Sequence, residues 1–186
     1  MNTDLLDRAI IYAVRAHAGT GRKGKNYPYI LHPLEALNIV AGITDDQEML
    51  AAAVLHDVLE DTPTTRDDLV REFGERVASL VESESDVEIS GMDHLSSWRQ
   101  RKEEALRRLQ SASRDEQIVA LGDKLSNMRT MAADYARIGD ALWQRFHETD
   151  REQHAWRYRA LADAFEPLAD TEACQEFRAL VKQIFG

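Results

Sequence analysis

One short segment of the sequence carries four side chains suited to metal or acid–base chemistry. His56 and Asp57 are neighbours, and Glu60 and Asp61 follow them four residues later. On a helix this spacing places the second pair one turn beyond the first. A lone His-Asp pair is usually solvated, but this pair follows the apolar run 51–55, where ionised groups are costly unless paired or bound to a metal. The segment therefore predicts two metal ligands with two further carboxylates beside them.

Two side chains elsewhere in the chain are candidates to complete a metal site. His32 is held at a helix start between Leu31 and Pro33, and Asp123 directly follows the apolar run 118–122. A set of two histidines and two aspartates suits a divalent transition ion such as Mn²⁺, Fe²⁺ or Zn²⁺, with room for water. Such an ion can activate water against a phosphate ester, with Glu60 or Asp61 as general base. The alternative for this acidic pair is a solvated helix end.

A basic cluster and one amide are the candidate ligand-binding groups. Arg22, Lys23 and Lys25 lie close together before Pro28. They suit a polyphosphate, and a guanidinium can also stack on a purine, although a solubilising loop has the same charge pattern. Asn127 lies one turn beyond Asp123, where it could contact a ribose or phosphate or serve as a supporting or capping amide.

The remaining histidines have no predicted role in the chemistry. His17, near the end of the first helix, is expected to be structural or to support the ligands. Polar surroundings predict a surface position for three others, His94, His147 and His154.

Composition narrows the class of protein. The 186 residues fit one domain, 1–186, and have a formal net charge of −10, which argues against nucleic acid as the main partner. The single cysteine excludes an internal disulfide and suits a reducing compartment. Neither a signal peptide nor an apolar run of about 20 residues is present, so a cytoplasmic protein without membrane contact is expected. The oligomeric state is left open.

The elements that must position these residues have helical apolar spacing. Strand-like alternation is nearly absent, so the sequence predicts an all-α bundle of about eight to ten helices, with a minor β-hairpin near 22–31 as the one exception. A third helix is expected to run unbroken from Asp45 or Asp46 to about Leu59, and a loop or helix break is expected over Glu82–Asp93. Four later helices are predicted at about 95–111, 114–136, 151–166 and 172–184.

Together these motifs resemble a known family. In order, they are RK (22–23), PYILHPL (28–34), LHDVLEDT (55–62), FGERV (73–77), WRQRK (98–102) and DKLSNMRT (123–130). The sequence resembles the HD-domain phosphohydrolases over about residues 5–135, specifically the hydrolase domain of the RelA/SpoT family and the single-domain small alarmone hydrolases of the metazoan SpoT homologue group.

The resemblance implies a function as well as a fold. It implies that His32, His56, Asp57 and Asp123 bind Mn²⁺ and that the Glu60-Asp61 pair orients and deprotonates the attacking water. The implied substrate is guanosine tetra- or pentaphosphate (ppGpp or pppGpp), which would lose its 3′-pyrophosphate.

Three departures from the family pattern leave the base of the substrate open. Thr20 replaces a glutamine, residues 120–122 read Ala-Leu-Gly instead of Lys-Leu-Ala, and the acidic segment 82–86 replaces a threonine-containing stretch that shapes the nucleotide pocket. Adenine alarmones such as ppApp, NADPH or simple nucleotides are alternative substrates of a broader HD phosphohydrolase. A non-catalytic metal or nucleotide sensor is the alternative from another class, but it predicts the loss of Glu60 or Asp61, and both are present.

Overall fold

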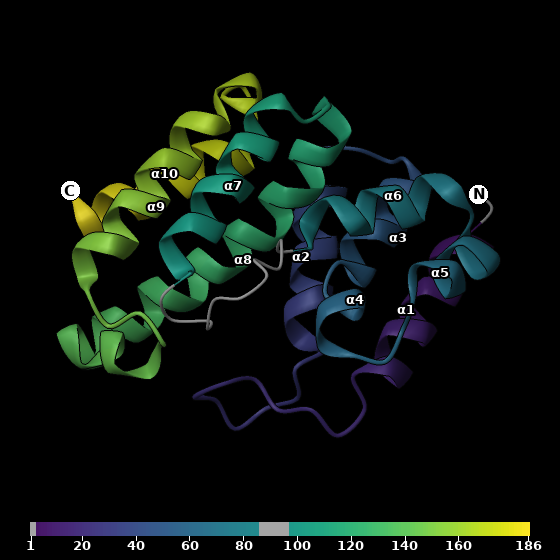
Figure 1. The fold of residues 1–186 in the computed structure, drawn as a ribbon, viewed down its shortest axis with the longest axis horizontal. Coiled ribbons are helices and arrows are strands. Elements are labelled where there is room, and N and C mark those ends of the chain that lie inside the picture. The colour runs from purple at the N-terminus through teal and green to yellow at the C-terminus, as the bar shows by residue number, and fades with distance from the viewer. Residues whose placement is uncertain (1–2, 86–96) are drawn as a thin grey trace.

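The computed structural model describes residues 3–85 and 97–186, and these residues confirm the predicted all-α fold. Ten α-helices and two short 3-10 segments make up this part of the chain (Figure 1). In chain order they are α1 (Asp4–Ala16), α2 (Leu31–Ala41), α3 (Gln47–Leu55), α4 (Val58–Asp61), α5 (Arg66–Phe73), α6 (Glu75–Glu84), α7 (Trp98–Ser111), α8 (Arg114–Ile138), η1 (Gly139–Arg145), α9 (Arg151–Ala164), η2 (Glu166–Leu168) and α10 (Glu172–Phe185).

Side-chain caps fix where several of these helices begin. The Asp46 carboxylate accepts hydrogen bonds from the backbone N–H groups of Glu48 and Met49 at the start of α3. Thr65 and Ser113 each form a reciprocal capping box, at the starts of α5 and α8 respectively. Each cap satisfies backbone donors that have no partner within the helix, so these boundaries follow from local sequence.

The predicted unbroken helix through His56 and Asp57 is wrong. α3 ends at Leu55, and α4 is a separate turn that begins at Val58. Asp57 has φ −98° and ψ −1°, which departs from helical geometry and redirects the chain between the two helices. No proline or glycine occurs between Gln47 and Asp61, so the local sequence has no signal for this break.

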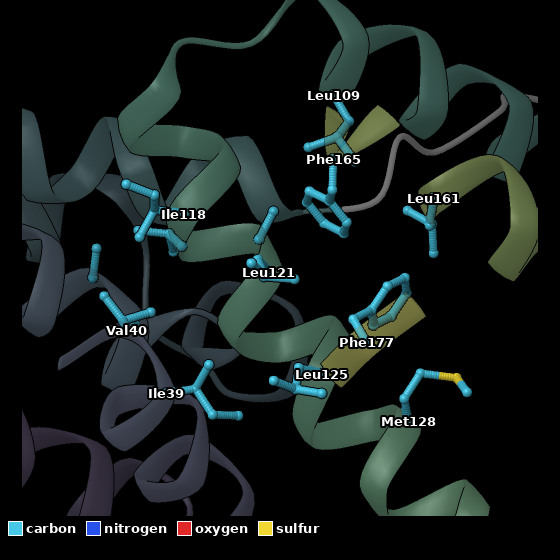
Figure 2. Packing of buried hydrophobic residues seen from close by; sticks show 14 of the residues in the cluster. Ile39, Val40, Leu109, Ile118, Leu121, Leu125, Met128, Leu161, Phe165 and Phe177 are labelled. Atoms are coloured by element: carbon cyan, nitrogen blue, oxygen red, sulfur yellow. The ribbon is translucent and has the colours of Figure 1, made fainter. Parts of the chain in front are cut away.

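Helix α8 is the central element of the core. Figure 1 shows α1–α6 toward the N-terminal end of the molecule and α7, α9 and α10 toward the other end, with α8 between them. Figure 2 shows side chains of α8 between Ile39 and Val40 of α2 on one side and Phe165 and Phe177 on the other. α8 therefore buries apolar side chains against both halves of the core.

The close contact of α2 with α8 requires a glycine. A Cβ atom added to Gly122 would lie 2.7 Å from Val40 Cγ2 and 3.0 Å from the Ala36 carbonyl oxygen. Only a residue without a side chain lets these backbones approach so closely. Gly122 therefore helps to set the separation between His32 on α2 and Asp123 on α8.

The expected hairpin near 22–31 is also corrected. Its only ladder element is one isolated antiparallel bridge between Gly21 and Pro28, and the described ranges contain no strand. Hydrogen bonds from Arg22 N to Tyr27 O and from Tyr29 N to Thr20 O close the loop. Pro28 has no N–H to donate, so the ladder does not extend.

Two further expectations can be compared with the structure. His154 is buried rather than on the surface, because its ring packs against Trp143, Trp98 and Phe146. The predicted loop over Glu82–Asp93 begins later than expected, since α6 continues through Glu84; its remainder from residue 86, and His94, lie outside the described residues. Among the described helices, none is both long and apolar enough to cross a membrane.

Candidate metal centre and nucleotide pocket

Two imidazoles and two carboxylates meet in the space between α2, α8 and the α3–α4 break. The Nε2 atoms of His32 and His56 are 3.3 Å apart. Asp57 Oδ2 lies 2.8 Å from His56 Nε2 and 3.5 Å from His32 Nε2, so these three residues form a group that could hold a metal ion. Asp123 Oδ1 approaches the same two nitrogen atoms, at 3.0 Å from His32 and 3.6 Å from His56. The edges of a tetrahedron with bonds of about 2.1 Å are about 3.4 Å long, so these separations suit a small divalent ion.

Hydrogen bonds behind the imidazoles aim both Nε2 atoms at the centre. His56 Nδ1 lies 2.8 Å from the Ala53 carbonyl oxygen, which can only accept, so this nitrogen carries the proton. Ser126 donates its hydroxyl proton to Glu35 Oε2 and must therefore accept from His32 Nδ1, at 2.8 Å. Each ring in its neutral form thus has an Nε2 lone pair available for a metal.

The two aspartates are ionised in this environment. Burial by itself raises the pKa of Asp57, but the adjacent imidazole of His56 outweighs it and lowers the pKa below the usual value. Burial likewise acts against ionisation of Asp123. The pKa of this carboxyl is nevertheless lowered, by Lys124 and by the imidazoles of His32 and His56. The centre therefore offers two anionic oxygen donors, as a divalent cation requires.

Asn127 connects the centre to the basic cluster. Its amide nitrogen donates to Asp123 Oδ1, while its carbonyl oxygen accepts from the Arg22 guanidinium. Arg22 also lies over the ring of Tyr29, 5.4 Å from its centroid. The residues singled out as metal ligands and those singled out as binding groups are thus joined through one side chain.

A cavity of about 400 Å³ opens beside this connection, and we call it the nucleotide pocket after the ligand that the sequence resemblance implies. It is lined by Arg22, Lys23, Asp61 and Asn127 from the predicted set, with Tyr29, Tyr158 and Phe146 among its aromatic walls. Its size is within the range of small-molecule sites. Lys25, in contrast, forms a salt bridge with Asp134, and Glu60 is exposed one residue before Asp61 on α4.

Tyr29 and Lys124 support the metal centre but were not predicted. The Tyr29 hydroxyl donates to Asp57 Oδ2 over 2.5 Å, and Lys124 Nζ bridges Asp123 and Glu84. Lys124 directly follows Asp123, and Tyr29 lies three residues before His32; their place within the quoted motifs is the only signal that the sequence contains. Their partners, Asp57 in the α3–α4 break and Glu84 on α6, are distant in the sequence, so sequence spacing could not reveal these contacts.

His17 is a buried histidine behind the nucleotide pocket. Its ring centroid is 5.0 Å from that of Tyr29, and neither ring nitrogen has a hydrogen-bond partner among the residues that the structure describes. Burial lowers the pKa of His17, so the ring is held neutral. This placement agrees with the structural or supporting role expected for it.

Comparison with protein families gives a match over most of the chain. A family model described as "HD domain" matches residues 9–151. Among curated proteins, a GTP pyrophosphokinase rsh of Brucella suis is 30% identical, and the match covers 99% of this chain and 26% of the relative. The bifunctional (p)ppGpp synthase/hydrolase SpoT of Escherichia coli K12 is 38% identical over 69% of this chain and 18% of its own length. The chain thus spans about a quarter or less of the length of these relatives.

Two solved structures have a similar fold over nearly their whole length. One belongs to a metazoan ortholog of SpoT that is described as hydrolysing ppGpp; it has a TM-score of 0.77 and 21% identity, and the match covers 98% of this chain and 97% of that one. The other is a protein of Listeria monocytogenes, with a TM-score of 0.72, 26% identity, and coverage of 83% of this chain and 98% of that one. At 21% and 26% identity, these two matches support the fold of the present chain.

Proposed function

The chain belongs to the HD-domain family, and we propose that it is a metal-dependent hydrolase that removes the 3′-pyrophosphate from guanosine tetra- or pentaphosphate. Support comes from the relatives named for (p)ppGpp synthesis and hydrolysis and from the metazoan SpoT ortholog described as a ppGpp hydrolase. The observation that carries the proposal is that Asn127 bonds both Asp123 at the metal centre and Arg22 in the nucleotide pocket. A nucleotide in this pocket would place one phosphate-bearing end beside the metal centre.

The proposed metal ligands are His32, His56, Asp57 and Asp123. Two imidazoles and two carboxylates suit Mn²⁺, the ion we propose, as well as Fe²⁺ or Zn²⁺. When bound, such an ion supplies a Lewis acid for the phosphate oxygens. The Nδ1 hydrogen bonds of both histidines support this assignment, because they leave Nε2 unprotonated in the neutral rings.

The chain's own groups have distinct proposed roles in the hydrolysis. Asp61, with Glu60 beside it on α4, accepts the proton of the attacking water. The water oxygen forms a bond to the phosphorus attached to the ribose, the bond from this phosphorus to the ribose 3′ oxygen breaks, and the 3′ oxygen takes up a proton to become a hydroxyl. Pyrophosphate is the other product. Arg22 and Lys23 bind and orient the nucleotide, and Arg22 is placed to stack on a base as it now lies over Tyr29. Cytoplasmic location remains part of the proposal.

The proposal is tested by pyrophosphate release from guanosine tetraphosphate in the presence of Mn²⁺. Asp57→Ala, Glu60→Gln and Asp61→Asn are compared with wild type, and Asp67→Asn, an exposed carboxylate on α5, is the matched control. Loss of a general base typically lowers kcat by about 10² to 10⁴. We expect losses of this order for at least one of Glu60→Gln and Asp61→Asn and wild-type turnover for the control.

Other outcomes would select the alternatives. Turnover of nucleoside monophosphates, NADPH or adenine alarmones without pyrophosphate release from guanosine tetraphosphate would indicate a broader HD phosphohydrolase. Nucleotide binding without turnover of any of these substrates would indicate a sensor.

A further inference from the structure

A second cavity adjoins the nucleotide pocket on the side away from the metal centre. Its volume is about 290 Å³, and it shares Lys23, Met131, Phe146 and Tyr158 with the nucleotide pocket. We call it the Arg157 pocket. Because the two cavities share these four side chains, they lie side by side.

The Arg157 pocket is basic in a strongly acidic protein. Lys23, Arg101, Lys102 and Arg157 line it, and Glu148 is the one carboxylate among the described residues of its lining, whereas the whole chain has a formal net charge of −10. Burial lowers the pKa of His154 in the same wall, so this ring is neutral and the positive charge of the pocket comes from its lysines and arginines. A local positive field of this kind favours an anion.

Two of these cations have no protein partner in the described chain. Arg157, half-buried on α9, forms no salt bridge or hydrogen bond with residues 3–85 or 97–186; its guanidinium lies 5.7 Å from the Tyr158 ring centroid. Lys23 likewise has no salt bridge to these residues. Lys23 is exposed, but Arg157 is half-buried, and removing a cation from water without a counter-charge is costly; an anion bound beside Arg157 would offset that cost.

The position of the pocket indicates which part of the ligand it takes. None of the candidate metal ligands lines it, and neither do Asp61 and Asn127, which lie in the nucleotide pocket beside the metal centre. A nucleoside in the nucleotide pocket therefore separates the Arg157 pocket from the reacting phosphate. We infer that Arg157 binds the 5′-diphosphate of the nucleotide whose 3′-diphosphate is hydrolysed, together with Lys23 and Lys102. This inference rests on the proposed function. Arg157 is then a specificity-determining residue that selects nucleotides phosphorylated at both ends.

The kinetic test compares two substrates that differ at the 5′ end. These are guanosine 3′,5′-bis(diphosphate) and guanosine 3′-diphosphate with a free 5′-hydroxyl. We expect Arg157→Gln to raise KM for guanosine 3′,5′-bis(diphosphate) about tenfold and to leave kcat nearly unchanged, because one charge-assisted hydrogen bond is lost. The kinetics with guanosine 3′-diphosphate should not change. Arg157→Lys should recover part of the loss. Arg107→Gln, an exposed arginine of α7 that lines none of these cavities, is the control for general loss of charge.

Two kinetic results would overturn the inference. Equal loss on both substrates would assign Arg157 to the 3′-diphosphate, and unchanged KM for both would remove it from the site, provided that thermal unfolding shows a folded variant.

A binding measurement keeps this test separate from that of the proposed function. Calorimetric titration of GDP, which has only the 5′-diphosphate, should show about tenfold weaker binding to Arg157→Gln than to wild type or Arg107→Gln. If wild type fails to hydrolyse guanosine tetraphosphate and this difference persists, the activity is wrong and the subsite stands. If hydrolysis occurs and GDP binding is unchanged by Arg157→Gln, the subsite is wrong and the activity stands.

Discussion

At the scale of single residues, a proton and a metal ion compete for the same position between the ligands. Burial alone lowers the pKa of His56, but the carboxylates of Asp57 and Asp123 outweigh it and raise the pKa well above 6.5. His56 Nε2 lies 2.8 Å from Asp57 Oδ2, to which it donates a hydrogen bond when it carries a proton. A metal can coordinate this nitrogen only after the proton has left.

Metal affinity should therefore rise with pH. Because the folded-state pKa of His56 is raised, the ring stays protonated above the pH at which a free histidine loses its proton. We expect the apparent Kd for Mn²⁺ to fall by about tenfold per pH unit while one proton is released, over a range near and above neutral pH. Calorimetry in buffers of different ionisation enthalpy measures both quantities, with Asp67→Asn as control. An affinity that is independent of pH would contradict the assignment of His56 as a ligand.

The side chain that joins the metal centre to the nucleotide pocket provides a second residue-scale prediction. Asn127→Ala removes one hydrogen bond to Asp123 and one to Arg22. Loss of a supporting contact to a metal ligand typically costs about 10- to 100-fold in metal affinity or activity, so both Mn²⁺ affinity and kcat/KM should fall. Asn38→Ala, an exposed asparagine on α2, is the control. A raised KM with wild-type Mn²⁺ affinity would assign Asn127 to the substrate alone.

At the scale of elements, helix ends and helix contacts position the ligands. The break between α3 and α4 lets the neighbouring side chains of His56 and Asp57 point to one place, whereas neighbours on a continuous helix diverge by about 100°. The distance between the other two proposed ligands, His32 and Asp123, depends on how closely α2 approaches α8. Gly122 permits that approach, because any Cβ there would meet Val40 and the Ala36 carbonyl.

Enlarging Gly122 should separate two of the proposed ligands. Gly122→Val forces α2 away from α8 and should lower the free energy of unfolding by about 2 kcal/mol, a typical cost of overpacking. Mn²⁺ affinity should fall as well, because His32 and Asp123 lie on the two displaced helices. Ala133→Val, at an exposed position of α8, should change both by much less. Urea unfolding and metal titration measure the two effects, and wild-type affinity in Gly122→Val would refute the role of this contact.

At the scale of the whole molecule, the buried histidines couple stability to pH. His154 lies among Trp98, Trp143 and Phe146, where α7, η1 and α9 meet, and burial lowers its pKa below 6.5. The unfolded chain therefore takes up a proton at a higher pH than the folded chain does. The free energy of unfolding therefore falls as the pH falls below about 6.5.

Replacing this histidine should remove part of that dependence. In His154→Phe the decline of the free energy of unfolding between about pH 7 and 5 should be shallower than in wild type, by at most about 1.4 kcal/mol per pH unit. His17, whose pKa is also lowered, and His56, whose pKa is raised, act equally in both proteins, so the difference isolates His154. Urea unfolding at several pH values measures it. Parallel curves for the two proteins would show that His154 is not held neutral by the fold.

The sequence by itself determined which residue types are available for chemistry and which elements carry them. Helical apolar spacing predicted the all-α fold and the later helices nearly to their ends, because this signal acts within a few residues. The structure shows that local caps such as Ser113–Glu116 fix where these helices begin. His32, His56, Asp57 and Asp123 were identified because each polar side chain interrupts an apolar stretch. Their roles as ligands, the catalytic roles of Glu60 and Asp61, and the single domain remain predictions.

Only the tertiary structure decided how these residues meet. The break at His56 and Asp57 and the burial of His154 depend on packing partners far away in the chain, for which local sequence has no signal. The same holds for the hydrogen bonds from Tyr29 to Asp57 and from Ser126 to Glu35, and for the Arg157 pocket. The physical reason is that helix formation is local, whereas the separation and rotation of packed helices depend on side chains from several elements at once.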